Sequence, residues 1–144
     1  MHGIAASRRQ LLAYEAEAWL RQNLTRPLTI ADLCQAVQTS ERTLHSAFRE
    51  RLGTTPKLHL KALRLEAARR ELLQGAPGTR ITDVALNWGF LHFGWFSHGY
   101  RQRFGETPSD TLRRAGRLAS RPALAPARAA HLREALPARP SAAA

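Results

Sequence analysis

Residues 30–56, IADLCQAVQTSERTLHSAFRERLGTTP, return in altered form as residues 81–108, ITDVALNWGFLHFGWFSHGYRQRFGETP. The opening blocks IADL and ITDV lie 51 residues apart, whereas the closing blocks LGTTP and FGETP lie 52 apart. One residue is gained between the blocks, where a turn tolerates it. A self-similarity of this length predicts two copies of one supersecondary unit.

Each copy has the pattern of a short helix, a turn and a second helix. In the first copy, Thr29 is the expected N-cap of a helix that runs to Val37, and Asp32 lies beside the positive end of its dipole. Ser40 is the expected N-cap of the next helix, and Gly53 is placed to end it.

The second copy predicts a helix from about Thr82 to Trp88, then a helix over residues 93–104 that ends at Gly105. Trp95, Phe96 and Tyr100 are candidates for the buried side of that second helix, and all three tryptophans are expected in the core. Flanking helices are predicted over residues 7–24, ended by Arg26-Pro27, and over residues 108–114.

Between the copies, Pro56 suits the first turn of a long helix over residues 56–74, which the loop around Gly75 and Gly78 ends. Its expected apolar stripe is Leu58, Ala62, Leu65, Ala68, Leu72 and Leu73. No strand pattern appears. The sequence therefore predicts an all-α fold of seven helices, with helix-turn-helix units at residues 8–55 and 79–115 joined by the linker helix.

Charge is unevenly distributed along the 144 residues, whose formal net charge is +11. Residues 113–144 contain seven Arg and one Glu, so more than half of the excess lies near the C-terminal end. Residues 117–144 are mostly Ala, Arg and Pro, which predicts a disordered tail. Two interpretations of its arginines stay open: they neutralise phosphates, or they are a solvated extension.

Several classes of protein are excluded or disfavoured. The single cysteine, Cys34, excludes an intramolecular disulfide. No apolar run approaches the roughly 20 residues that span a bilayer, and the N-terminus lacks the apolar core of a signal peptide. The expectation is a cytoplasmic protein without a membrane partner.

The second helix of each copy has the layout that a major-groove helix requires, with an apolar inner face and hydrogen-bonding groups outside. With Leu44 and Phe48 inward, the outward set of the first copy is Arg42, Thr43, His45, Ser46 and Arg49. The outward set of the second copy is Phe93, Gly94, Ser97, His98 and Arg101. No carboxylate occurs between Gly89 and Gly105, which favours an anionic partner such as double-stranded DNA.

Three other interpretations compete with DNA binding. The helices are a protein-interaction module, or ordinary amphipathic surface helices, or part of an enzyme that uses Cys34. A zinc site is disfavoured because His92 and His98 are not at i, i+3 or i+4 and have no Cys or carboxylate nearby. Cys34 is expected to be a small buried residue between helices.

The motifs resemble the DNA-binding domain of the AraC/XylS family of bacterial transcription regulators. The first half carries RPLTIxDL from Arg26, SxRTLxxxFR from Ser40 and LGxxP from Leu52. The second half carries IxDVA, GF, FS, YR and FGxTPS between residues 81 and 109. The resemblance covers residues 8–115, and WGFLHFGxFS from Trp88 resembles a branch that includes ethanolamine-utilisation operon regulators.

This resemblance implies that the helices at about 40–52 and 93–104 enter adjacent major-groove segments on one face of the duplex. Tandem units in one chain need no two-fold symmetry, which predicts a non-palindromic site of about two helical turns. The base-facing positions it implies are Arg42, His45, Ser46, Phe93, Gly94, Ser97 and His98. Gly94 stands where the family often has serine, and His98 where it often has arginine. Gly99 costs a helix about 0.5–1 kcal/mol relative to alanine, which predicts a weaker second recognition helix.

The resemblance also implies an activator rather than a repressor. Neither an enzyme nor a cofactor is expected, because the spacing supports no Ser-His-Asp or paired-carboxylate arrangement and the loop at residues 75–78 lacks the lysine and the flanking strand of a phosphate-binding loop. RNA polymerase and an N-terminal sensor or dimerisation domain are the partners expected besides DNA.

Overall fold

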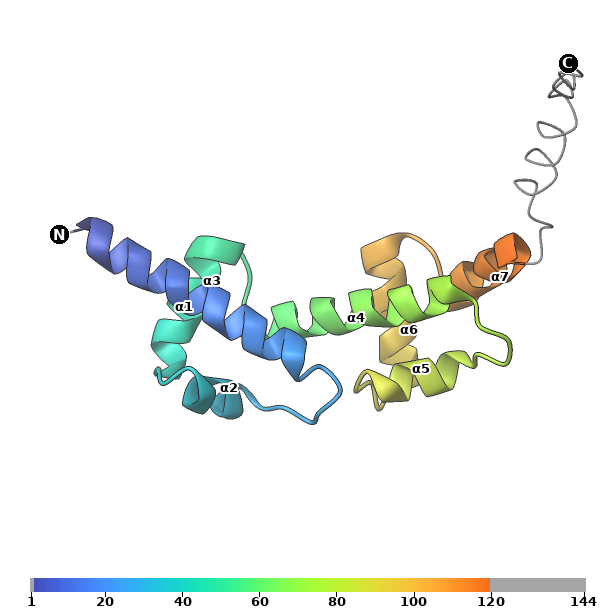
Figure 1. Cartoon of the computed structure of the whole chain (residues 1–144), viewed down its shortest axis with the longest axis horizontal. Helices are drawn as coiled ribbons and strands as arrows, with labels where there is room; N and C mark the ends of the chain where they lie inside the picture. Colours follow the sequence, from blue (N-terminus) through green and yellow to red (C-terminus); the bar gives the residue numbers. More distant parts are fainter. Residues whose placement is uncertain (1, 120–144) are drawn as a thin grey trace, which may run out of the picture.

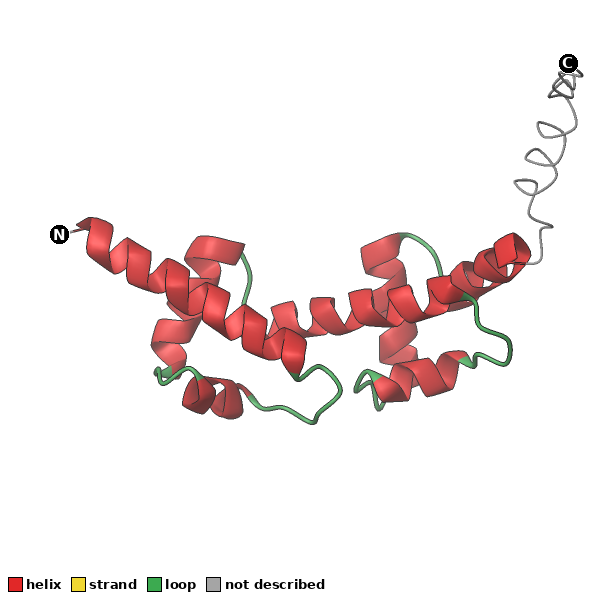
Figure 2. Cartoon of the chain, in the orientation of Figure 1, coloured by secondary structure: helices red, strands yellow, loops and turns green. Residues whose placement is uncertain are grey.

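The computed structural model describes residues 2–119, with side chains from residue 8 onward. Within that range it contains seven α-helices and no strand (Figure 2). In chain order they are α1 His2–Gln22, α2 Ile30–Ala36, α3 Glu41–Leu52, α4 Pro56–Gln74, α5 Ile81–Asn87, α6 Phe93–Phe104 and α7 Pro108–Ala119. The all-α prediction is confirmed.

Thr29, Ser40, Gly53 and Gly105 cap α2, α3 and α6 as predicted, whereas the N-cap residues of α5 and α6 make no side-chain capping bond. The Thr29 hydroxyl accepts from the Asp32 amide, and the Asp32 carboxylate accepts from the Thr29 amide at 2.9 Å, which completes a capping box. Ser40 caps α3 through the Thr43 amide. Gly105 ends α6 in the left-handed region at φ 72°.

The two outermost helices are longer than predicted. The first begins at His2 rather than near residue 7, and α7 continues through Gly116 to Ala119 rather than ending near Arg114. A single glycine lowers helix propensity by about 1 kcal/mol without breaking a helix. Residues 117–119, which the sequence assigned to the tail, are therefore helical, and the rest of the predicted tail lies outside the described residues.

The long helix α4 serves two separate cores (Figure 1). In Figure 1, α1, α2 and α3 lie around one end of α4, and α5 and α6 lie around the other. The first core joins α1, α2 and α3 to α4 through Leu60, Leu63 and Ala67. The second joins α5 and α6 to α4 through Leu65, Ala68 and Leu72. At about 100° per residue these two sets lie on different sides of the helix.

The single apolar stripe predicted for α4 is therefore wrong at both ends. Leu58 is 58% exposed and Leu73 is 45% exposed, while Leu60 and Leu63, outside the predicted stripe, are buried. A helix that faces two cores in turn shows no single periodic face, so the pattern misassigned these residues.

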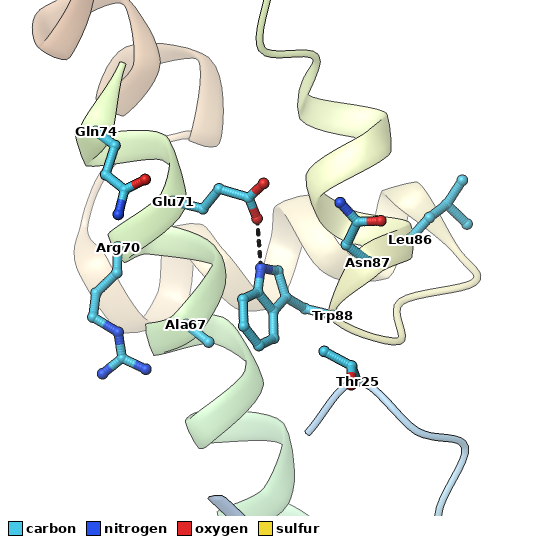
Figure 3. Close-up of a pocket in the computed structure, with 8 residues that line it drawn as sticks. All are labelled: Thr25, Ala67, Arg70, Glu71, Gln74, Leu86, Asn87 and Trp88. Carbon is cyan, nitrogen blue, oxygen red and sulfur yellow. Dashed lines mark hydrogen bonds between the residues drawn. The ribbon is translucent and has the colours of Figure 1, made fainter. Parts of the chain in front are cut away.

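A junction on α4 fixes the two units to each other. Trp88 packs against both cores, and its indole Nε1 donates to Glu71 Oε2 at 2.7 Å (Figure 3). Arg64 donates from Nε to the Leu24 carbonyl at 3.1 Å and from Nη2 to the Arg26 carbonyl at 2.8 Å. The linker helix is thus hydrogen-bonded to the α1–α2 loop and to the end of α5, so the units share one framework.

Gly99 has a packing reason that the sequence did not reveal. It is buried where α6 approaches α4, and a Cβ added there would lie 3.1 Å from Lys61 Cε and 3.6 Å from Leu65 Cδ1. The absence of a side chain allows the two helices to come this close, which offsets the lower helix propensity of glycine.

Candidate nucleic-acid interface

The candidate interface is built on α3 and α6, which match residue for residue. Both helices have 12 residues, and their first residues, Glu41 and Phe93, are 52 positions apart. Both end at a glycine with positive φ, whose amide donates to the carbonyl of the arginine four residues earlier. In Figure 1, α3 lies beside the N-terminal end of α4 and α6 beside its C-terminal half.

The first ridge, Arg42, Thr43, His45, Ser46 and Arg49, lies on the outer side of α3. Leu44, Ala47 and Phe48 are fully buried on the opposite side, as the sequence predicted. Arg42, Thr43 and Arg49 are exposed, whereas His45 and Ser46 are half-buried. Neither Arg42 nor Arg49 forms an ion pair with any described residue, so both guanidinium groups are available to an external anion.

The remaining polar groups of α3 are held locally. The Ser40 hydroxyl donates to Thr43 Oγ1 at 2.9 Å, and His45 Nε2 lies 3.8 Å from Glu41 Oε1. Glu50 is paired with Arg9 of α1. Both glutamates are exposed beside the ridge rather than buried beneath it.

The second ridge, Phe93, Gly94, Ser97, His98 and Arg101, lies on the outer side of α6. Phe93 is 47% exposed, Gly94, His98 and Arg101 are exposed, and Ser97 is half-buried. Phe96 and Tyr100 are fully buried on the inner side, as predicted. The Tyr100 hydroxyl is 2.7 Å from Thr111 Oγ1, which anchors α6 to α7.

Trp95 is not in the core, contrary to the prediction. Its side chain is 73% exposed, and its ring lies tilted at 48° against that of His92 at a centroid distance of 4.7 Å. The 52-residue offset makes Trp95 the counterpart of Thr43, which the sequence analysis had placed outward. The repeat itself was therefore the signal that could have found this exposed residue, whereas the general preference of tryptophan for burial pointed the other way.

Charge is distributed differently around the two helices. Arg103 of α6 pairs with Glu66 of α4, so that arginine belongs to the α4–α6 contact rather than to the second ridge. The pKa of Asp110 is lowered, first by the Thr107 amide and in smaller part by Arg113 and Arg101. Arg101 makes the smallest of these contributions, and like Arg42 and Arg49 it forms no ion pair with a described residue.

Other kinds of site find little support in the described residues. No group of three or more His, Cys, Asp or Glu is placed to hold a metal ion in the part of the chain that the structure describes. Cys34 is half-buried against the first core, and burial raises the pKa of its thiol, which disfavours the reactive thiolate. None of the helices in residues 2–119 is long and apolar enough to cross a membrane.

An open cleft lies at the junction, away from both ridges. It is lined by Thr25 of the α1–α2 loop, by Arg70, Glu71 and Gln74 of α4, and by the end of α5 (Figure 3). The indole of Trp88 closes one side of it through its bond to Glu71.

The sequence of this chain is similar to those of known proteins. A helix-turn-helix domain family matches residues 33–114. The "Probable thc operon regulatory protein" of Rhodococcus erythropolis is 42% identical over 96 residues, which cover 66% of this chain and 29% of that protein. The "XylDLEGF operon transcriptional activator" of Pseudomonas putida is 41% identical over 96 residues, which cover 66% of this chain and 30% of that protein.

Solved structures share the fold. A probable AraC family transcriptional regulator from Rhodopseudomonas palustris superposes with a TM-score of 0.68 at 38% identity, covering 72% of this chain and 96% of that one. An AraC-type regulator from Chromobacterium violaceum gives a TM-score of 0.69 at 30% identity, and the superposition covers 76% of this chain and 96% of that one. The matched segment spans about 30% of the length of these two curated relatives. With the family matched over more than half of its residues and the tandem units in place, the chain belongs to the AraC/XylS family, as a helix-turn-helix DNA-binding domain of its transcription regulators.

Proposed function

We propose that this domain binds a non-palindromic DNA site of about two helical turns and reads successive major-groove segments with its two ridges. The observation that carries the proposal is the pairing of two exposed outer faces on helices of equal length, held by one linker helix. Tandem units in one chain need no two-fold symmetry in the site, because one unit is not the rotated copy of the other.

Within the first ridge, Arg42 is assigned to a base edge and Arg49 to a phosphate. Arg42 lies in the first turn of α3, the end of a recognition helix that contacts bases, and arginine can make a bidentate pair with guanine. Arg49 lies in the last turn, farther along the groove. In the second ridge, Phe93, Gly94, Ser97 and His98 are assigned to base edges and Arg101 to a phosphate.

The wider role we propose is that of a cytoplasmic activator domain. The relative from Pseudomonas putida carries the word activator in its name, and such proteins are far longer than the matched segment. An N-terminal sensor or dimerisation domain and RNA polymerase are the partners proposed on that ground.

The test is selection of bound duplexes from a random library, followed by affinity measurements on the selected site with Arg42→Ala. Loss of a bidentate arginine–guanine pair is expected to weaken binding by about 1–3 kcal/mol and to relax preference at one base position only. Arg70→Ala is the matched control, because Arg70 is an exposed arginine on α4 beside the junction cleft rather than on a ridge. This control should leave the preference unchanged at every position.

Two outcomes would count against the proposal. Equal weakening by Arg42→Ala on all sequences would assign Arg42 to a phosphate instead. Selection that returns no preferred sequence, together with a shallow dependence of affinity on salt, would identify the ridges as a protein-interaction surface.

A further inference from the structure

The start of α6 exposes aromatic and apolar side chains. Leu91 is 83% exposed, Trp95 73% and Phe93 47%. The other two tryptophans, Trp19 and Trp88, pack against the cores. Large aromatic side chains outside a core concentrate at binding surfaces, which makes these residues candidate contacts for a partner.

The exposed rings are held in position rather than loose. The ring of Trp95 lies tilted against that of His92, the N-cap residue of α6, whose side chain makes no capping hydrogen bond. The ring of Phe93 packs on that of the buried Phe96 at a centroid distance of 6.3 Å. Between the two exposed residues stands Gly94, and a Cβ added there would meet nothing within 4 Å. Phe93 and Trp95 are about 200° apart around the helix, so their side chains flank the open surface at Gly94 on either side. We call these three residues the aromatic slot.

The corresponding turn of α3 has the opposite chemistry. The 52-residue offset places Glu41 opposite Phe93, Arg42 opposite Gly94 and Thr43 opposite Trp95. At these positions the first unit has the guanidinium group of Arg42, whereas the second has no side-chain hydrogen-bond donor or acceptor apart from the indole N–H of Trp95. A half-site that suits one helix therefore cannot suit the other by the same contacts.

The largest apolar group on the major-groove edges of the bases is the C5-methyl group of thymine. We propose that the aromatic slot receives a thymine methyl group, so that the second half-site is read by apolar contact while the first is read by Arg42. The inference rests on the proposed function and names the base that its second ridge selects. The absence of carboxylates between Gly89 and Gly105 favours a nucleic-acid occupant over a basic protein surface.

The test uses the full chain and the selected duplex, with each thymine of the second half-site replaced in turn by deoxyuridine, which lacks only the methyl group. At one position or two neighbouring positions, affinity should fall about fourfold, the factor that corresponds to burying one methylene-sized group. The same replacement in the first half-site should leave affinity unchanged.

Two variants assign the effect to the slot. Trp95→Ala should weaken binding to the thymine duplex and abolish the difference between thymine and uracil, whereas the matched Thr43→Ala in α3 should retain that difference. Because Trp95 is exposed, its loss should leave the circular dichroism spectrum and unfolding midpoint unchanged. Gly94→Arg, for which the structure leaves room, should replace the thymine preference at that position by a guanine preference.

The failures of the two proposals are distinguishable. A preferred sequence whose affinity is indifferent to uracil at every position overturns the aromatic slot and leaves sequence-specific binding intact. Uracil discrimination that survives Trp95→Ala also overturns it, and a Trp95→Ala variant that binds DNA as the wild type does would reassign this surface to a protein partner. Absence of any preferred sequence overturns both proposals.

Discussion

At the residue scale, Arg64 connects loops that are distant in sequence. Its guanidinium bonds to two carbonyls of the α1–α2 loop and also lies against the α5–α6 turn, where its Cζ is 3.0 Å from the position that a Cβ on Gly89 would occupy. Burial lowers the pKa of Arg64, yet the group stays cationic because arginine titrates so far above neutral pH. Arg64 thus acts as a positioning residue for the two units, and the glycine at φ +87° makes room for it.

A double-mutant cycle tests this contact. Arg64→Ala should lower the free energy of unfolding by about 2 kcal/mol, because two charge-assisted hydrogen bonds are lost. Gly89→Ala should cost about 2–3 kcal/mol with Arg64 present, from the positive φ and the close guanidinium. In the Arg64→Ala background, Gly89→Ala should cost only about 1 kcal/mol, because the strain of the positive φ remains but the contact with the guanidinium is gone. Urea unfolding measures all four corners, and strictly additive effects would show that the two residues do not interact.

At the element scale, the caps explain why most helix ends could be predicted. The caps act within a few residues of their own position, so their role can be predicted from the neighbouring sequence; these residues are Thr29, Ser40, Gly53 and Gly105. The buried face of α4 depends on two cores on different sides of it, and the exposure of Trp95 depends on where α6 meets α4. Both features depend on how helices pack against one another, and the spacing of apolar residues within one helix carries no information about that packing. The DNA-contact roles of the two ridges remain predictions.

The capping carboxylates make stability depend on pH. The pKa of Asp32 is lowered by the Thr29 amide and hydroxyl, and that of Asp110 by the Thr107 amide and hydroxyl. A carboxyl whose pKa is lower in the folded state stabilises the protein above its unfolded pKa, and that contribution is lost as the pH falls through the folded value. The urea midpoint should therefore fall between pH 5 and pH 2, and Asp32→Asn and Asp110→Asn should each reduce that dependence.

Asp83→Asn is the matched control for the capping prediction. Asp83 lies in the first turn of α5 at the position that corresponds to Asp32, but the N-cap there, Arg80, makes no side-chain capping bond. Its replacement should change the pH dependence less than Asp32→Asn does. An equal change would mean that the charge at the helix start, rather than the reciprocal cap, is responsible.

At the scale of the whole molecule, the distance between the two ridges is set by α4. Its 19 residues extend about 28 Å at 1.5 Å per residue, compared with the roughly 34–36 Å between entries one helical turn apart. The ridges project from helices packed against this linker, and a modest DNA bend can supply the remaining difference. Because Trp88 contacts both cores and Arg64 bonds across the junction, the units cannot adjust their separation independently.

This rigidity predicts a fixed spacing between half-sites. Inserting five base pairs between the half-sites rotates the second one to the opposite side of the duplex. Inserting ten base pairs returns it to the original side but moves it about one helical turn farther away. Both insertions should reduce affinity to that of a duplex with one scrambled half-site, measured by fluorescence anisotropy at constant salt. A flexible linker would recover part of the affinity with ten added base pairs. Affinity on that duplex above the single-half-site level would therefore show that the two units move independently and that α4 does not set the spacing.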